Sequence, residues 1–204
     1  MIPGVTSPKT ESRAAGSRNS VRIIGGSWRG RKLRFPPSSG LRPTPDRVRE
    51  TLFNWLAART PGARCLDLFA GAGALGLEAL SRGAGEVVFV EQAVAAARAL
   101  REQLTRLGAE RRAQVVEMGA ARYLRGPAAP FDIVFLDPPF GQDALTEYIP
   151  LLDSGRWVKA GGLVYLENEK RTGAPALPAH WELLKSKSAG EVGYHLARVL
   201  PREP

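Results

Sequence analysis

The sequence contains few residues of the kinds that form disulfides or bind transition metals. Among 204 residues there are one cysteine, two methionines and two histidines. The single Cys65 cannot form a disulfide within the chain, which fits a reducing compartment such as the cytoplasm. The histidines, His180 and His195, have no cysteine partners beside them, so we predict no metal centre.

Long apolar runs are also missing. No stretch approaches the roughly 20 apolar residues that a membrane-spanning helix needs, and residues 1–20 lack the apolar core of a signal peptide. Apolar residues make up 44% of the chain and charged residues 24%, and its length suffices for one α/β domain with a small extension. We therefore expect a cytoplasmic protein with no membrane partner and, by default, a monomer.

Acidic residues are scarce in the first quarter of the chain. Residues 1–49 hold 11 lysines or arginines against only Glu11 and Asp46, so this segment carries the whole net charge of +9. Such a one-sided excess is expected where a segment contacts a polyanion such as nucleic acid. A basic tail that only aids solubility is the alternative, but the basic residues continue into segments patterned as secondary structure.

This first quarter divides into a tail and a patterned extension. Residues 1–20 are rich in Ser, Gly, Thr and Pro without an apolar period, which predicts a disordered basic tail. The β-type runs 21–24 and 31–35 flank a glycine-rich turn and predict a β-hairpin with exposed arginines. We assign residues 21–60 to a small basic extension that is expected to contact a polyanion such as RNA.

A helix is predicted after the hairpin. Thr44 has the side chain of an N-cap, and Pro45 fits the first helical position. Apolar residues then recur at helical spacing, so one face of the helix should pack on the main domain. Arg47 and Arg49 are expected on its other faces.

Residues 61–204 alternate between short apolar runs and helical patterns. We predict strands at 65–69, 87–91, 114–118, 132–136 and 163–167, helices at 75–82, 94–107 and 143–152, and a short helical turn near 120–124. This alternation predicts a parallel sheet with helices on both faces. The runs 181–188 and 192–200 have no helix between them and predict a closing antiparallel hairpin. The fold class is therefore α/β, of the Rossmann-like methyltransferase type rather than that of NAD dehydrogenases.

A glycine-rich turn follows the first strand of this domain. The segment DLFAGAGALG runs from Asp67 to Gly76 and contains G-x-G-x-x-G between a strand and a helix, where a ligand can approach the backbone. Glu91 ends the next strand, where its carboxylate can accept hydrogen bonds from ribose hydroxyls. Asp67 would repel a pyrophosphate but suits a cationic methionine moiety, which favours S-adenosylmethionine over a dinucleotide.

A second motif, Asp137-Pro138-Pro139-Phe140, follows a buried-looking strand. The two prolines remove two N–H donors and stiffen the loop, at the sheet edge where ligands bind in open α/β proteins. Acceptors on Asp137 and the Pro138 carbonyl suit an exocyclic NH₂ group, and Phe140 can stack on a base. Orienting both N–H bonds turns the nitrogen lone pair toward a methyl donor, so alignment can supply much of the catalysis.

These motifs, taken with the N-terminal stretch, resemble the RsmD family of methyltransferases. The resemblance rests on RIIGG at 22–26, WRGRKL at 28–33, GLRPTPDRVRETLFNWL at 40–56, the region 65–82 and the Asp-Pro-Pro-Phe motif. It covers roughly residues 21–200. It implies methylation of the N2 amino group of a guanosine in small-subunit (16S) ribosomal RNA, either naked or in an assembling small subunit.

The resemblance also implies roles for individual residues. S-adenosylmethionine would be bound by Asp67, Phe69, Gly71, Gly73, Glu91, Gln92, Gly119 and Ala120. The guanine would be held by Asp137, Pro138, Pro139 and Phe140. RNA phosphates would be contacted by Arg29, Arg31, Arg42, Arg47 and Arg49.

The sequence departs from the family pattern at two places. Relatives carry Asp or Asn after the third strand for the adenine amino group, whereas the matching position here is Gly119. Relatives often carry a second acid shortly after Glu91, where this chain has Gln92 and Ala93. Backbone groups at Gly119 and Ala120 are the expected replacements.

Three other functions fit parts of the pattern. A methyltransferase for adenine N6 or cytosine N4 would also use Asp-Pro-Pro-Phe, since those bases present an exocyclic NH₂ too. A ribosome-assembly protein that binds RNA without catalysis would keep the basic extension, but the intact Asp137, Gly71, Gly73 and Glu91 argue against lost catalysis. An NAD-dependent oxidoreductase is disfavoured by Asp67 and by the closing hairpin.

Overall fold

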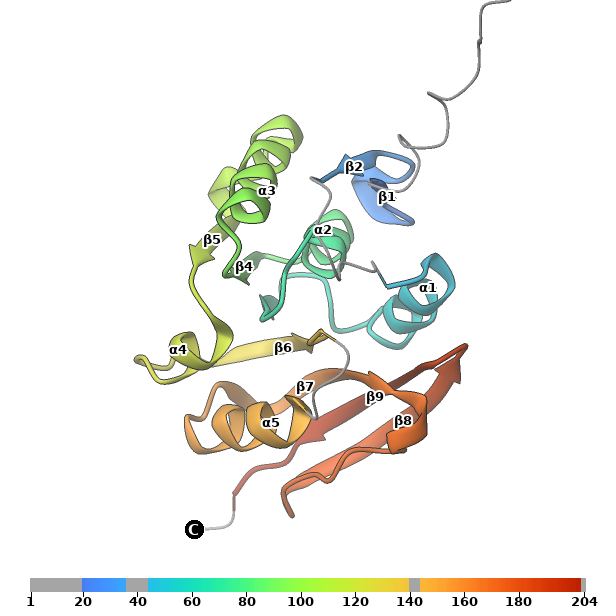
Figure 1. The fold of residues 1–204 in the computed structure, drawn as a ribbon, viewed down its shortest axis with the longest axis vertical. Helices are drawn as coiled ribbons and strands as arrows, with labels where there is room; N and C mark the ends of the chain where they lie inside the picture. The colour runs from blue at the N-terminus through green and yellow to red at the C-terminus, as the bar shows by residue number, and fades with distance from the viewer. Residues whose placement is uncertain (1–19, 36–43, 140–143, 203–204) are drawn as a thin grey trace, which may run out of the picture.

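The structure is a computed structural model that describes residues 20–35, 44–139 and 144–202. The tail predicted at 1–20 lies almost wholly outside these residues. The described chain forms one seven-stranded sheet and a separate two-stranded hairpin (Figure 1). No helix among the described residues is long and apolar enough to cross a membrane.

The large sheet is mostly parallel and has the strand order β5-β4-β3-β6-β7-β9-β8. Neighbours from β5 to β7 pair in parallel, and β9 pairs antiparallel with both β7 and β8. The strands are β3 (Arg64–Asp67), β4 (Glu86–Glu91), β5 (Ala113–Glu117), β6 (Phe131–Leu136), β7 (Val158–Glu169), β8 (Trp181–Ala189) and β9 (Val192–Val199). The predicted Rossmann-like sheet with its closing hairpin is confirmed.

Helices cover both faces of this sheet. The helices are α1 (Asp46–Trp55), α2 (Ala74–Ser81), α3 (Val94–Leu107), α4 (Ala120–Leu124) and α5 (Ala144–Ser154). Apolar side chains of α1, α2 and α3 pack in one core cluster, and those of α4 and α5 pack in another. Consecutive strand residues such as Cys65 and Leu66 fall into opposite clusters, because strand side chains alternate between faces.

The predicted strands and helices of residues 61–204 agree with the observed ones to within two residues at each end, except at β7. The bounds of α3 agree with the prediction, and the short turn predicted near 120–124 is the helix α4, whereas β7 begins five residues before the predicted 163. Its early part contains Gly161, whose φ of 77° and adjacent glycine are typical of a turn. The strand continues across this point because the register between β6 and β7 shifts there, so the glycines belong to a β-bulge.

The predicted N-terminal hairpin is confirmed as β1 (Ser20–Arg22) paired antiparallel with β2 (Lys32–Arg34). A 3-10 turn, Gly26–Trp28, lies between the two strands. Gly26 has a φ of 75°, and a Cβ there would lie 1.9 Å from the Ser81 carbonyl oxygen. Only glycine lets the hairpin turn approach α2 this closely.

The start of α1 differs from the prediction. The helix begins at Asp46, and Pro45 rather than Thr44 occupies the N-cap position. The Pro45 carbonyl accepts from the N–H groups of Val48 and Arg49, at 2.9 and 3.1 Å. The Thr44 side chain donates instead to the Asp137 carboxylate, so the N-cap assignment of Thr44 was wrong. A hydrogen bond that a hydroxyl donates to a charged carboxylate is stronger than one that it accepts from a backbone N–H as an N-cap.

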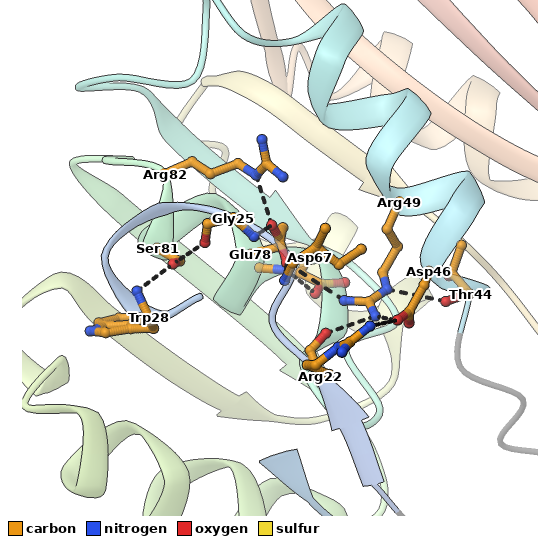
Figure 2. A network of polar contacts seen from close by, with 12 residues as sticks. Arg22, Gly25, Trp28, Thr44, Asp46, Arg49, Asp67, Glu78, Ser81 and Arg82 are labelled. Carbon is orange, nitrogen blue, oxygen red and sulfur yellow. Dashed lines mark hydrogen bonds and ion pairs between the residues drawn. The ribbon is translucent and has the colours of Figure 1, made fainter. Parts of the chain in front are cut away.

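A buried glutamate on α2 fastens the hairpin to the domain (Figure 2). Glu78 accepts hydrogen bonds from the backbone N–H groups of Ile24 and Gly25, each at 2.8 Å. Its carboxylate also pairs with Arg82 at 2.7 Å and lies 3.6 Å from Arg49 Nη1. The side chain of Glu78 is fully buried, so these contacts compensate a charge removed from water.

Arg49 is buried as well, which corrects its expected contact with RNA phosphates. Its side chain is 0% exposed and donates to the carbonyls of Thr44 and Arg22 and to the Asp46 carboxylate. The helical period explains the placement, because Arg49 lies on the same face as the buried Leu52 and Phe53. Arg49 therefore joins β1, α1 and α2 and presents no charge to RNA.

Replacing Glu78 with Gln is expected to destabilise the protein strongly. The change leaves the Arg49 guanidinium buried without its carboxylate on α2, and breaking a buried pair typically costs about 3–5 kcal/mol. Denaturant unfolding measures the effect. The control is Glu102→Gln on α3, which removes an exposed pair with Arg98 worth less than about 1 kcal/mol. Equal losses of unfolding free energy in the two variants would contradict this role of Glu78.

Candidate active site

The carboxyl ends of four neighbouring strands bring the predicted site residues together. Asp67 is the last residue of β3, Glu91 ends β4 and Asp137 directly follows β6. Glu167 lies near the end of β7, which pairs with β6. The strand order reverses between β3 and β6, and open α/β sheets bind ligands at such switch points.

The glycine-rich turn has the backbone that its sequence predicts. Gly71 and Gly73 have φ values of 50° and 75°, in the left-handed region that favours glycine. Gly76 has a different role, because a Cβ there would lie 2.2 Å from the Phe89 ring. The first two glycines therefore shape the turn, and the third lets α2 pack on the sheet.

Carboxylates hold this turn from two sides. Asp67 Oδ2 accepts the N–H of Gly76 at 2.9 Å, and Glu91 Oε2 accepts the N–H of Gly71 at 2.8 Å. Glu91 Oε1 also accepts the N–H of Ala93, at 2.7 Å. Glu91 thus ties the loops after β3 and β4 together, a role that the sequence reasoning missed. Each oxygen keeps a lone pair for a further donor.

Gln92, Gly119 and Ala120 lie beside this turn. Gly119 is the N-cap of α4, Ala120 is its buried first residue, and Gln92 is exposed. A Cβ at Gly119 would lie 3.6 Å from Gln92 Oε1. The side-chain amide of Gln92 therefore sits next to the position where the family pattern has Asp or Asn.

Phe69 packs on an aromatic residue that the sequence did not single out. Its ring meets Tyr148 of α5 edge-on, with centroids 4.9 Å apart and planes at 85°. Such T-shaped pairs are favourable beyond their buried area. This contact joins the loop after β3 to the helix that follows the Asp-Pro-Pro-Phe motif.

The described part of that motif ends at Pro139. Asp137 is partly exposed, Pro138 is buried and Pro139 is exposed, whereas Phe140 lies outside the described residues. Asp137 Oδ2 accepts the Thr44 hydroxyl at 2.9 Å. Burial raises the pKa of Asp137 to about 6, although the Thr44 hydrogen bond lowers it.

Three acidic side chains lie at this edge of the sheet and have no basic side chain paired with them among the described residues. Among the described residues the structure records no ion pair for Asp67, Asp137 or Glu167. Burial raises the pKa of Asp67 to about 7, against the Gly76 hydrogen bond, and the charges of Asp137 and Glu91 raise it further. A site of this charge disfavours pyrophosphate and suits a cationic ligand, such as one with a sulfonium and an ammonium group.

The predicted RNA-contacting arginines divide into three groups. Arg29, Arg31 and Arg47 are exposed, and the described residues give them no ion pair. Arg42 lies outside the described residues, and Arg49 is the buried arginine already described. A hollow between the hairpin and the start of α1 is lined by Ser20, Val21, Arg22, Lys32, Thr44, Pro45 and Asp46. It leads from the basic hairpin toward Thr44, which contacts Asp137.

Sequence reasoning missed Thr44, Tyr165 and Glu167 as parts of the site. Glu167 is 2% exposed and accepts the Tyr165 hydroxyl at 2.6 Å. A signal was present, since a glutamate among the apolar residues of a central strand needs a buried partner. The described residues hold no group of three or more His, Cys, Asp or Glu side chains arranged for a metal ion.

The raised pKa of Asp67 predicts a pH-dependent stability. Its folded pKa of about 7 exceeds the ordinary value of 3.8, so Asp67 stabilises the fold below pH 3.8, and this contribution is lost as the pH rises to about 7. Between pH 5 and 7 the wild type should lose about 2 kcal/mol of unfolding free energy relative to Asp67→Asn. Denaturant unfolding at several pH values checks this.

The matched control is Glu110→Gln, which removes an exposed carboxyl. Its pH dependence should follow that of the wild type. If Asp67→Asn also follows the wild type, Asp67 is already ionised at pH 5, and the electrostatic account of the site is wrong.

Known proteins match nearly the whole described chain. A family model described as Conserved hypothetical protein 95 matches residues 21–198. Ribosomal RNA small subunit methyltransferase D of Escherichia coli strain K12 is 51% identical over 176 residues, which are 86% of this chain and 88% of that protein. The Haemophilus influenzae protein of the same name is 45% identical over 184 residues, covering 88% and 94%.

Solved structures match the fold. The Escherichia coli protein yhhF superposes with a TM-score of 0.83 at 47% identity, over 89% of this chain and 98% of that chain. A methyltransferase of Podospora anserina, solved with bound SAH, shares the fold at 17% identity, with a TM-score of 0.63 over 78% and 80% of the two chains. The extent of the family match and the identities to its members confirm the resemblance seen in the sequence: the chain belongs to the RsmD family of methyltransferases.

Proposed function

We propose that this protein transfers a methyl group from S-adenosylmethionine to the exocyclic N2 amino group of a guanosine in small-subunit (16S) ribosomal RNA. The observation that carries the proposal is the position of Asp137, a partly exposed carboxylate one strand away from the glycine-rich turn. The close relatives named ribosomal RNA small subunit methyltransferase D support the substrate. The guanine and its N2 atom come from the family resemblance of the sequence.

The cofactor site is assigned to the residues around the glycine-rich turn. They are Asp67, Phe69, Gly71, Gly73, Glu91, Gln92, Gly119 and Ala120. S-adenosylmethionine supplies an electrophilic methyl group on a positively charged sulfur. Asp67 and its acidic neighbours stabilise positive charge, and the positive φ values of Gly71 and Gly73 keep the turn free of side chains. Glu91 holds the Gly71 backbone and keeps lone pairs for hydroxyl donors.

The base is assigned to Asp137, Pro138, Pro139 and Phe140. Thr44 occupies Oδ2 of Asp137, so Oδ1 is the oxygen left to accept an N–H of the amino group. The Pro138 carbonyl accepts the second N–H. These two acceptors orient the nitrogen lone pair, and alignment of this kind can supply several kcal/mol of catalysis. With a pKa of about 6, Asp137 is ionised at neutral pH and can take up the proton that the product nitrogen releases.

RNA contact is assigned to the basic extension, residues 21–60. Arg29, Arg31 and Arg47 offer free charges to phosphates, and Arg42 stays a prediction. A paired base cannot enter a recessed site at the sheet edge, so the guanosine is unpaired or flipped out. We propose that the substrate is small-subunit ribosomal RNA, either naked or in an assembling small subunit, and that the protein acts as a monomer in the cytoplasm.

Methyl transfer to purified small subunits, naked small-subunit RNA and DNA tests the proposal. Labelled S-adenosylmethionine is the donor, and the products are digested to nucleosides and identified by mass spectrometry. We expect N2-methylguanosine from RNA. Asp137→Asn keeps the shape but removes the charged acceptor, so its rate should fall by about a hundredfold or more.

Other results of this assay would change the proposed substrate or the proposed activity. Methylated adenine or cytosine in the products would mean that the enzyme acts on the amino group of that base and not on guanine N2. A folded protein that binds RNA and S-adenosylmethionine but transfers nothing would be an assembly factor. Glu110→Gln is the control for the rate, because it changes an exposed carboxyl outside the proposed site.

The exposed arginines are expected to set the salt dependence of RNA binding. Replacing Arg29, Arg31 or Arg47 with Gln should weaken binding to all RNA sequences alike and reduce the slope of log K against log salt by roughly 0.7–0.9 per lost phosphate contact. Fluorescence titrations over a range of salt measure this. Arg106→Gln, an exposed arginine in the last turn of α3, should leave the slope unchanged. Equal slopes in all variants would remove the hairpin and α1 from the RNA interface.

A further inference from the structure

Two lysines of the C-terminal hairpin, β8–β9, face the same side of the sheet as α1. Lys185 and Lys187 lie on β8 and pair across the strands with Leu196 and Tyr194 of β9. Residues that lie opposite each other on neighbouring strands point to the same face of a sheet. Because Leu196 and Tyr194 pack in the core cluster that contains the apolar residues of α1, both lysines project on the α1 side.

The charges of these lysines are not neutralised within the protein. Both side chains are exposed, and the described residues give neither of them an ion pair. The strands β8 and β9 also carry Glu182 and Arg198, which pair with each other. The hairpin strands therefore present a net positive surface, as a contact surface for a polyanion requires.

An aromatic ring of α1 lies next to one of these lysines. Trp55, the last residue of α1, is half-buried, and its ring stacks on Tyr194 with centroids 5.5 Å apart and planes at 25°. Lys187 Nζ lies 5.9 Å from the centroid of the Trp55 ring. A cation–π contact restrains an ammonium group without neutralising its charge. Basic side chains beside a partly exposed aromatic ring are typical of surfaces that bind single-stranded nucleic acid.

The cross-strand pairing places Lys187 near the candidate site. Tyr194 pairs with Lys187 on one side and with Glu167 of β7 on the other. The strand β7 pairs in turn with β6, which Asp137 directly follows. Neighbouring strands lie about 4.8 Å apart, so the three steps from β6 to β8 span roughly 14 Å. Nucleotides that adjoin a base held at Asp137 can reach across this distance.

The helix α1 lies between the basic hairpin β1–β2 and the C-terminal hairpin (Figure 1). Arg49 of α1 donates to the Arg22 carbonyl of β1 at 2.9 Å, and Trp55 contacts Tyr194 of β9. Thr44, which precedes α1, donates to the Asp137 carboxylate. An RNA strand whose base enters at Asp137 therefore has one hairpin on each flank.

We propose that Lys185, Lys187 and Trp55 form a second RNA-contacting surface, on the opposite flank of the target nucleotide from the β1–β2 hairpin. The two lysines bind phosphates, which fixes the position of the RNA without reading its sequence. The proposal rests on the proposed RNA substrate, but not on the identity of the methylated base. The charge distribution along the sequence concealed this surface, because the first 49 residues alone account for the net charge of +9.

The edge position of β8 offers another role for its lysines. This strand ends the sheet, and lysines on an edge strand discourage pairing with other chains. Edge protection needs neither the contact with Trp55 nor RNA. It predicts that removing the lysines causes self-association and leaves RNA binding unchanged, so RNA titration and light scattering separate the two roles.

The first test removes the two charges together. Lys185→Gln/Lys187→Gln should weaken binding to naked small-subunit RNA roughly fivefold or more and reduce the slope of log K against log salt by about 1.4–1.8, which is 0.7–0.9 for each contact. The control Arg106→Gln/Arg111→Gln removes the same charge from exposed positions at the end of α3 and in the turn after it. A wild-type slope in the lysine variant, with or without self-association, or an equal loss in the control, would overturn the proposal.

The aromatic ring and the kinetics give separate readouts. Trp55→Leu keeps an apolar contact with Tyr194 but removes the cation–π partner of Lys187. It should weaken RNA binding about twofold with the slope unchanged, because no charge is lost. In the double lysine variant the KM for RNA should rise while kcat at saturating RNA stays within about twofold of the wild type. A fall in kcat with an unchanged KM contradicts a binding surface.

A footprint on the wild-type protein needs neither variants nor turnover. Lysines are acetylated with and without naked small-subunit RNA, and their modification is measured by mass spectrometry. RNA should shield Lys185, Lys187 and Lys32 of the β1–β2 hairpin, whereas Lys159 at the start of β7 should stay reactive. Shielding of Lys32 alone overturns the second surface and leaves the proposed function standing. Shielding of none of the three contradicts RNA contact by either hairpin, whichever base is methylated.

Discussion

The contact between Arg49 and Glu78 is the interaction on which the arrangement of this protein depends. Both side chains are completely buried, and together they meet the carbonyl of Arg22, the N–H groups of Ile24 and Gly25, and the carbonyl of Thr44. Arg49 Nη1 has no hydrogen-bond partner among the described residues and lies 3.6 Å from Glu78, while Asp46 pairs with Arg49 Nη2 and Arg82 pairs with Glu78, so the two buried charges belong to one network. Because these groups come from the hairpin, α1 and α2, the pair fixes the basic hairpin to the methyltransferase fold. It also sets the position of Thr44 and, through Thr44, of Asp137.

Charge is distributed in opposite ways on the surface and in the site. The net charge of +9 is concentrated in the first quarter of the chain, and Arg29, Arg31 and Arg47 of that quarter are exposed. The sheet edge instead gathers the buried Asp67 and Glu167 and the partly exposed Asp137, and desolvation is the first cause of their raised pKa values. A basic surface attracts a polyanion over long distances, whereas closely spaced acids act only at contact range. The protein can therefore bind RNA on its outside and keep a cation-favouring site within a few residues of that surface.

The sequence predicted the features that depend on near neighbours in the chain. Strand and helix periods located every strand of the sheet at least in part, and the glycine spacing predicted the turn at Gly71 and Gly73, whose φ values are positive. The first half of β7 was missed because Gly161 and Gly162 resemble a turn until β6 supplies the pairing partner. Thr44 was assigned to a cap and Arg49 to the surface for the same reason, since their partners lie up to 93 residues away in the chain. The sequence predicted Arg49 on another face of the helix than the apolar residues; its spacing from Leu52 and Phe53 allows burial, and its carboxylate partners Asp46 and Glu78 explain why a charge is stable there.

The position of β9 has a consequence for the order in which the molecule is completed. This strand is the last in the chain, yet it lies inside the sheet between β7 and β8. During synthesis on the ribosome, β7 has no partner on that side until residues 192–199 have emerged, and an unpaired strand edge invites association with other chains. The cofactor-side half of the sheet, β3 to β6, can pair earlier because its strands are all upstream. Tyr194 of β9 pairs with Glu167 across the strands, so the buried acid acquires its full surroundings only after β9 has been synthesised.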